Sequence, residues 1–140
     1  MYHHGVAVLY AIILAFIGSQ GLKLALFSRR GALHVKDLAV TGGMPSAHCA
    51  VVTALSTSVY FTEGMTPLFF TTVVLAVIVI RDALGVRRTA GEEGKLLNEV
   101  IKKTRLKLPK VHYSLGHLPT EVAAGIGIGL LSAGAAVWLL

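Results

Sequence analysis

Residues 5–27 read GVAVLYAIILAFIGSQGLKLALF, an apolar run broken only by Ser19, Gln20 and Lys23. A run of this length is enough for a helix to cross a bilayer. Three further apolar runs follow, from Met44 to about Phe61, from Pro67 to about Gly85, and from Pro119 to Leu140. No basic region precedes the first run, so we interpret it as a retained helix rather than a cleaved signal peptide. The sequence therefore predicts an all-α integral membrane bundle of about four transmembrane helices.

The composition supports one membrane-embedded domain spanning residues 1–140. Of the 140 residues, 54% are hydrophobic and only 14% are charged, whereas a soluble domain carries roughly 25% charged residues. The single cysteine, Cys49, lies inside an apolar run and is interpreted as a small hydrophobic residue. Leu96, Leu97, Val100 and Ile101 recur at helical spacing among charged residues, which predicts one amphipathic helix at the membrane interface.

The Lys and Arg residues gather in or beside the first and third connections, at 23–36 and 81–110. The second connection carries only Glu63. Basic loops stay in the cytoplasm, so we expect both basic connections there and both termini outside, with the protein in the plasma or inner membrane. The net charge of +6 flanks apolar runs. Membrane lipids or a lipid phosphate substrate are therefore the expected partners, and nucleic acid is not.

Four short segments carry polar groups that a purely apolar bundle has little reason to keep. In the four-span topology each falls at the cytoplasmic end of a different helix, so packing of the helices should bring them to one depth. They are Gln20-x2-Lys23, Gly42-Gly43-Met44-Pro45-Ser46-Ala47-His48, Arg81-Asp82-x2-Gly85-Val86-Arg87-Arg88 and Leu115-Gly116-His117-Leu118-Pro119-Thr120-Glu121.

This layer offers the groups needed for phosphoryl transfer. The turn at Gly43 and the following helix start present backbone N–H groups to an anion, and Ser46 adds a hydroxyl donor. His48 and His117 supply two imidazoles, one to attack phosphorus and one to protonate the leaving oxygen. Glu121 lies four residues after His117 and can orient its ring if the segment is helical. Fixed positive charge comes from three residues, Lys23, Arg87 and Arg88.

The combination Gly-Gly-Met-Pro-Ser-Ala-His at 42–48, Arg-Asp-x2-Gly-Val-Arg-Arg at 81–88 and Leu-Gly-His-x-Pro-x-Glu-Val at 115–122 resembles a known family. It is similar to the type 2 phosphatidic acid phosphatase superfamily, which includes vanadium haloperoxidases, and most of all to its divergent, small bacterial-type branch. The resemblance covers about residues 20–130.

The resemblance implies a phosphatase of lipid phosphates or polyprenyl diphosphates that works through phosphohistidine, without a metal or other cofactor. His117 would be the nucleophile, His48 the general acid and Glu121 the residue that orients His117. The phosphate would be held by Lys23, Ser46 and the backbone at Gly43, and by an Arg of the pair Arg87 and Arg88. Asp82 and Gln20 are expected to support these groups from behind.

The sequence also departs from the mainstream motifs. Gly31 follows Arg30 where the first motif has Pro, and Ala47 stands where the second has Gly. The third motif has Ser-Arg five residues before its His, where this chain has Lys110-Val111. Six spans are usual in the superfamily, against about four here.

Three alternatives stay open. The first is a non-catalytic lipid-phosphate binder or scaffold with a degenerate site. The second is a metal site built from His48, His117 and a carboxylate. The third open point concerns assembly and not function. Gly125, Gly129 and Ala133 form a face of small residues on the last span, and close packing on such a face makes a homodimer possible.

Overall fold

The computed structural model describes residues 2–29, 43–113 and 116–139, and these residues form helices and connecting segments without strands. The prediction of an all-α membrane bundle is confirmed. The helices are α1 (Tyr2–Arg29), α3 (Ala47–Glu63), α4 (Pro67–Leu84), α5 (Val86–Thr104) and α6 (Pro119–Leu139).

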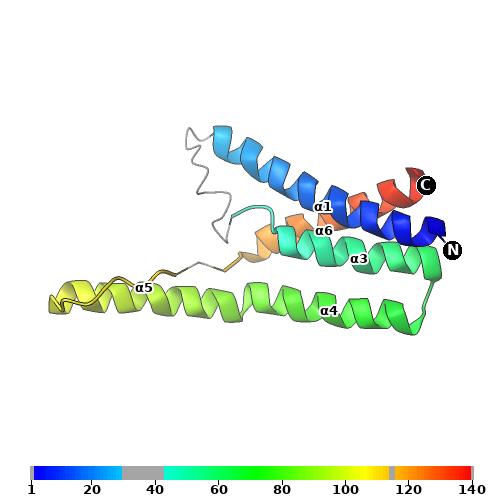
Figure 1. The fold of residues 1–140 in the computed structure, drawn as a ribbon. Helices are drawn as coiled ribbons and strands as arrows, with labels where there is room; N and C mark the ends of the chain where they lie inside the picture. The colour runs from blue at the N-terminus through cyan, green and yellow to red at the C-terminus, as the bar shows by residue number, and fades with distance from the viewer. Residues whose placement is uncertain (1, 30–42, 114–115, 140) are drawn as a thin grey trace.

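Helices α1, α3 and α6 pack against one another along most of their lengths, and α4 packs on the outer side of α3 (Figure 1). The centre of the bundle is built from small side chains, which let the helix axes approach closely. The buried cluster consists of Ala11, Ala15, Ala50, Ala54, Ala133 and Ala136. Little apolar side-chain volume is needed inside because the surrounding lipid accommodates the large apolar residues.

The large apolar side chains indeed point outward. Ile17 is 62% exposed and Ile78 is 60% exposed, values that suit contact with lipid rather than water. Three stretches within the described residues are long and apolar enough to span a membrane: His4–Ser28, Pro67–Thr104 and Pro119–Leu139. Helix α3 has 17 residues and reaches about 26 Å, at the lower limit for a span. The expected count of four transmembrane helices is consistent with this arrangement.

A tight turn joins α3 to α4. Gly64 ends α3 with a φ of 72°, a left-handed conformation that favours glycine. Thr66 then accepts the N–H of Phe69 through its side chain, and Pro67 occupies the first turn of α4. Both chain termini lie at this end of the bundle, and α5 extends beyond the other end (Figure 1).

The small-residue face of α6 is covered within a single chain. A methyl group placed on Gly129 would lie 2.5 Å from the carbonyl oxygen of Ala50, and one on Gly125 would collide with the carbonyl oxygen of Ser46. Close packing on α3 therefore explains this face. A homodimer stays a prediction, and it would need another surface.

Gly85 is the one residue between α4 and α5. Helix α5 continues in nearly the same direction as α4 and extends beyond the bundle (Figure 1). Gly85 has φ −107° and ψ −85°, outside the helical range. The amphipathic helix predicted around residues 95–103 is thus the second half of α5. A non-helical segment, residues 106–113, then returns alongside α5 toward the start of α6. We call α5 together with this returning segment, residues 86–113, the basic arm.

Candidate active site

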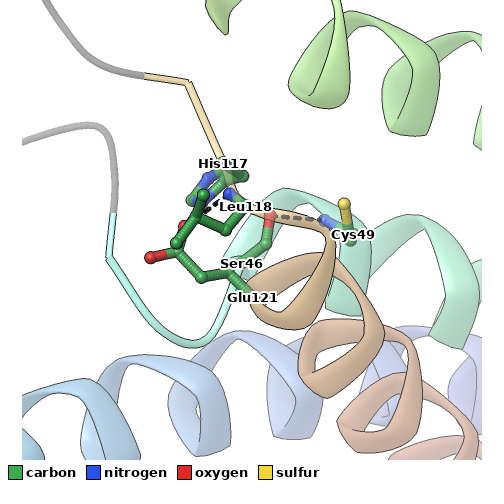
Figure 2. A network of polar contacts seen from close by, with 5 residues as sticks. All are labelled: Ser46, Cys49, His117, Leu118 and Glu121. Carbon is green, nitrogen blue, oxygen red and sulfur yellow. Dashed lines mark hydrogen bonds and ion pairs between the residues drawn. The ribbon is translucent and has the colours of Figure 1, made fainter.

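The ring of His117 is held by Glu121 at the start of α6 (Figure 2). Nδ1 of His117 lies 3.0 Å from Oε2 of Glu121, and the two side chains are 9% and 13% exposed. The same carboxylate oxygen accepts the backbone N–H of Leu118 at 3.1 Å. With the proton on Nδ1 donated to Glu121, Nε2 of His117 keeps its lone pair and can act as a nucleophile or base.

Local sequence explains this geometry. Pro119 opens α6 at a position where a missing N–H costs nothing. Glu121 is then the third residue of the helix, from which a glutamate reaches back to the N–H just before the helix. Its negative charge also lies at the positive end of the helix dipole. The carboxylate of Glu121 therefore both caps the start of α6 and orients the ring of His117.

The backbone at His117 is fixed to the neighbouring helices. The N–H of His117 donates to the carbonyl oxygen of Ala83 in α4 at 3.1 Å. A side chain on Gly116 would collide with the backbone N of Arg88, so only glycine lets the chain pass this close to the start of α5. His117 is therefore positioned by three elements, α4, α5 and α6.

His48 and His117 line the same small cavity, as the phosphoryl-transfer hypothesis requires. The cavity measures about 10 Å³ and is lined by His48, Val79, Asp82, Ala83, Arg87 and His117. His48 is exposed, whereas His117 is buried. A volume of this size holds about one water molecule, so a phosphate group could enter only if an exposed lining side chain moved outward.

The side chains of Arg87 and Arg88 contact different partners. Arg87 lines the cavity and its Nε donates to Oδ2 of Asp82 at 2.6 Å. Arg88 instead contacts Glu92, one turn along α5, at 3.2 Å. Both side chains are nearly half exposed. Of the two, Arg87 lies with the histidines, whereas Arg88 does not line the cavity. Asp82, which the sequence analysis expected behind the phosphate-binding groups, lines the cavity beside Arg87.

The start of α3 packs beside the start of α6, next to His117 and Glu121. The hydroxyl of Ser46 is fully buried and accepts the N–H of Cys49 at 3.5 Å (Figure 2). The backbone N–H of Ser46 donates to the carbonyl oxygen of Glu121 at 3.0 Å. Ser46 thus caps α3 and ties it to α6, and a contact between its hydroxyl and a phosphate stays a prediction.

The side chain of Lys23 extends from α1 to the start of α3 and α6. Its side chain is buried and interacts electrostatically with Glu121. A methyl group on Gly43 would lie 3.5 Å from Cε of Lys23, and Gly43 has a φ of 86°. The charge of Glu121 favours the protonated ammonium of Lys23 near the start of α6. Gln20 lies three residues before Lys23 on α1 and is half-buried.

All four polar segments therefore meet at one end of the bundle, as the topology predicted. Gly42, Arg30 and Leu115, which also belong to the sequence motifs, lie outside the described residues. In the part of the chain that the structure covers, no three or more His, Cys, Asp or Glu side chains gather as metal ligands do. Two backbone groups of the site were not predicted from the sequence. The carbonyl of Ala83 leaves no signal in residue type, whereas the spacing of Pro119 and Glu121 at a helix start could have indicated the N–H of Leu118.

Comparison with known proteins identifies the family of this chain. The model of the divergent PAP2 family matches residues 5–132. An uncharacterized membrane protein of Bacillus subtilis (strain 168), YuiD, is 39% identical, over 65% of this chain and 68% of its own length. No solved structure matches. The family match covers most of the spanning helices together with His48, His117 and Glu121. This chain is an integral membrane protein that belongs to the divergent PAP2 family.

Proposed function

We propose that this protein is a metal-independent phosphatase that acts on a lipid phosphate or polyprenyl diphosphate through a phosphohistidine intermediate. One observation carries the proposal. The ring of His117 is oriented by Glu121 at 3.0 Å, and His117 shares a cavity with His48 and Arg87. A nucleophile with a partner that orients it, a second proton-transfer group and a cation are the parts of a covalent phosphoryl-transfer site.

In the first step, Nε2 of His117 attacks the terminal phosphorus, and the P–O bond to the leaving group breaks. The leaving group is the lipid alcohol of a monophosphate or the lipid phosphate of a diphosphate. The proton for the leaving oxygen comes from His48, which must be protonated at that moment. Arg87 compensates charge on the phosphoryl oxygens, and Asp82 holds the guanidinium in place through the 2.6 Å contact.

In the second step, water attacks the phosphorus of phosphohistidine. His48, now neutral, accepts the proton from this water, and the P–N bond breaks to release inorganic phosphate. His117 returns to its starting state with its Nδ1 proton still donated to Glu121. The carboxylate stabilises the positive charge that the ring carries while it is phosphorylated, and it stays ionised throughout.

A lipid is the preferred substrate because the site lies where spans end. His48 is the second residue of α3, and Glu121 is the third residue of α6. A phosphate at the headgroup level would meet this layer while its acyl or prenyl chain stayed in the bilayer. The Lys and Arg residues of the basic arm lie beyond this end of the bundle, and the positive-inside rule therefore favours a site at the cytoplasmic face with both termini outside.

The test is phosphate release by the purified chain in bilayers that contain phosphatidate, phosphatidylglycerophosphate or a polyprenyl diphosphate, with a chelator present. We expect release with at least one substrate and its loss in His117→Ala. A matched control is His112→Ala, which alters an exposed histidine of the basic arm. Activity that survives His117→Ala would refute the assignment of the nucleophile.

A second candidate is a non-catalytic protein that binds lipid phosphate. Two features favour it: the cavity between the histidines is small, and the hydroxyl of Ser46 is engaged in a helix cap. Trapping with substrate carrying a radiolabelled phosphoryl group distinguishes the two. The enzyme forms an acid-labile, base-stable phosphoprotein that His117→Ala abolishes, whereas a binder retains the lipid and never becomes labelled.

A further inference from the structure

The basic arm, residues 86–113, lies beyond the ends of the spans and takes no part in the proposed chemistry except at its base. Helix α5 has 19 residues and extends about 28 Å from Gly85. The returning segment, residues 106–113, leads back toward α6 (Figure 1). Both ends of the arm are thus tethered to spans, at α4 and at α6.

The arm is held together as one unit. The side-chain amide of Asn98 donates to the carbonyl oxygen of Val111, and its carbonyl accepts the N–H of Val111, both at 2.8 Å. Nearer the bundle, a methyl group on Gly94 would lie 2.5 Å from Cβ of Tyr113, so α5 offers a glycine where the ring packs. The returning segment covers the side of α5 that carries Gly94 and Asn98.

Another side of α5 is apolar and uncovered. Leu96, Leu97 and Val100 share an arc of the helix by their spacing, and they are 61%, 49% and 51% exposed. Leu106 and Leu108 on the returning segment are more than half exposed as well. Exposed apolar side chains grouped in this way mark an interaction surface.

The charge of the same region is strongly positive. Residues 95–110 carry one acidic residue, Glu99, and six basic residues: Lys95, Lys102, Lys103, Arg105, Lys107 and Lys110. Four of the six line a cleft of about 790 Å³ between α5 and the returning segment, together with Leu106, Leu108 and Tyr113. The cleft thus combines cations with apolar walls, and this combination is complementary to anionic phospholipids, whose phosphates lie next to acyl chains.

We propose that the basic arm docks on the anionic phospholipid surface of the bilayer from which it emerges. Leucine and valine side chains would enter the boundary between headgroups and acyl chains, while the lysines and arginines pair with lipid phosphates. A second copy of this chain fits less well, because pairing two arms would set two strongly basic surfaces side by side. This inference goes beyond the proposed phosphatase and does not depend on it.

Docking requires a bend at Gly85, because α5 continues the direction of α4 in the structure (Figure 1). Gly85 is the only residue between the two helices, and glycine accepts new backbone angles more readily than any other residue. Arg87 and Asp82 are paired across this junction, and the long arginine side chain can keep this contact through a modest bend. The arm would therefore turn as a unit about its base.

The test follows a fluorescent probe on the arm of the full chain in nanodiscs that hold one copy each. A nitrobenzoxadiazole group is attached to Leu97→Cys in a Cys49→Ala background. Discs of phosphatidylcholine are compared with discs of equal phosphatidylcholine and phosphatidylglycerol. The control probe is Met65→Cys, in the turn at the opposite end of the bundle.

We expect quenching of the probe at residue 97 by an uncharged, water-soluble nitroxide to fall several-fold in the anionic discs, and added salt to restore it. The probe at residue 65 should respond equally in both lipids. Replacing Lys102, Lys103 and Arg105 by Gln should remove the lipid effect, whereas Arg81→Gln, outside the arm, should leave it. As a check without labelling, anionic discs should slow trypsin cleavage in the arm of the unaltered chain.

Equal quenching and equal cleavage in both lipids would overturn the inference. Protection that needs two copies per disc, whatever the lipid, would assign the surface to a second copy. Protection that needs added RNA would assign it to nucleic acid. Phosphatase activity enters none of these measurements, so failure here leaves the proposed function untouched.

Discussion

Replacing Glu121 by Gln tests the part of the site on which the proposed chemistry most depends. Oε2 of Glu121 accepts two donors, Nδ1–H of His117 at 3.0 Å and the N–H of Leu118 at 3.1 Å. In Glu121→Gln the backbone N–H of Leu118 can be satisfied only if the amide oxygen takes this position. His117 then keeps its proton on Nδ1, and Nε2 stays nucleophilic.

What the substitution removes is the negative charge. A hydrogen bond to a charged group contributes about 1.5–3 kcal/mol, against about 0.5–1.5 kcal/mol for a neutral one. The two side chains are only 9% and 13% exposed, so solvent screens little of this difference. A loss of about 1.4 kcal/mol as the ring becomes positive corresponds to a roughly tenfold slower phosphorylation.

The rate to measure is formation of phosphohistidine in a single turnover, because it isolates the chemical step from lipid binding and product release. Thermal unfolding of the variant checks that the start of α6 is intact. Glu121→Ala, which leaves the N–H of Leu118 and the ring without their acceptor, should be slower than Glu121→Gln. A Glu121→Gln protein as fast as the wild type would show that the carboxylate serves only as a helix cap.

Arg87→Gln should lower kcat/KM for lipid phosphate at least about tenfold, the value of one charged hydrogen bond, whereas Arg88→Gln should change it little; steady-state kinetics of both variants decides. Gly129→Ala should lower the thermal unfolding temperature, since overpacking costs about 1–3 kcal/mol, while Gly127→Ala, which meets nothing within 4 Å, should not. Asn98→Ala should free the returning segment from α5, which faster amide hydrogen exchange at residues 108–113 would reveal and unchanged exchange would contradict.

The membrane architecture was predictable because it depends on composition along the chain. A segment of about twenty apolar residues has few alternatives to a spanning helix. The turn at Gly64 to Pro67 and the glycine break at Gly85 also follow from residue type. These features are local, so each can be recognised without knowing what packs against it.

The pairing of His117 with Glu121 was predictable for the same reason. A spacing of four residues, with Pro119 between them, places both at one helix start. The choice between Arg87 and Arg88 was not predictable, because adjacent residues on a helix point about 100° apart and only the position of α4 decides which faces the histidines. The role of Ser46 as a buried cap likewise depends on how α6 covers it.

By itself, the sequence determined where the spanning helices of the described residues begin and end, and which polar residues stand at those ends, since hydrophobicity, glycine and proline act over a few residues. Only the tertiary structure decided that Gly125 and Gly129 serve packing on α3, that Arg87 and not Arg88 lines the cavity, and that His48 and His117 share it. Those outcomes depend on the rotation of each helix about its own axis. That rotation is set by contacts between segments far apart in the chain.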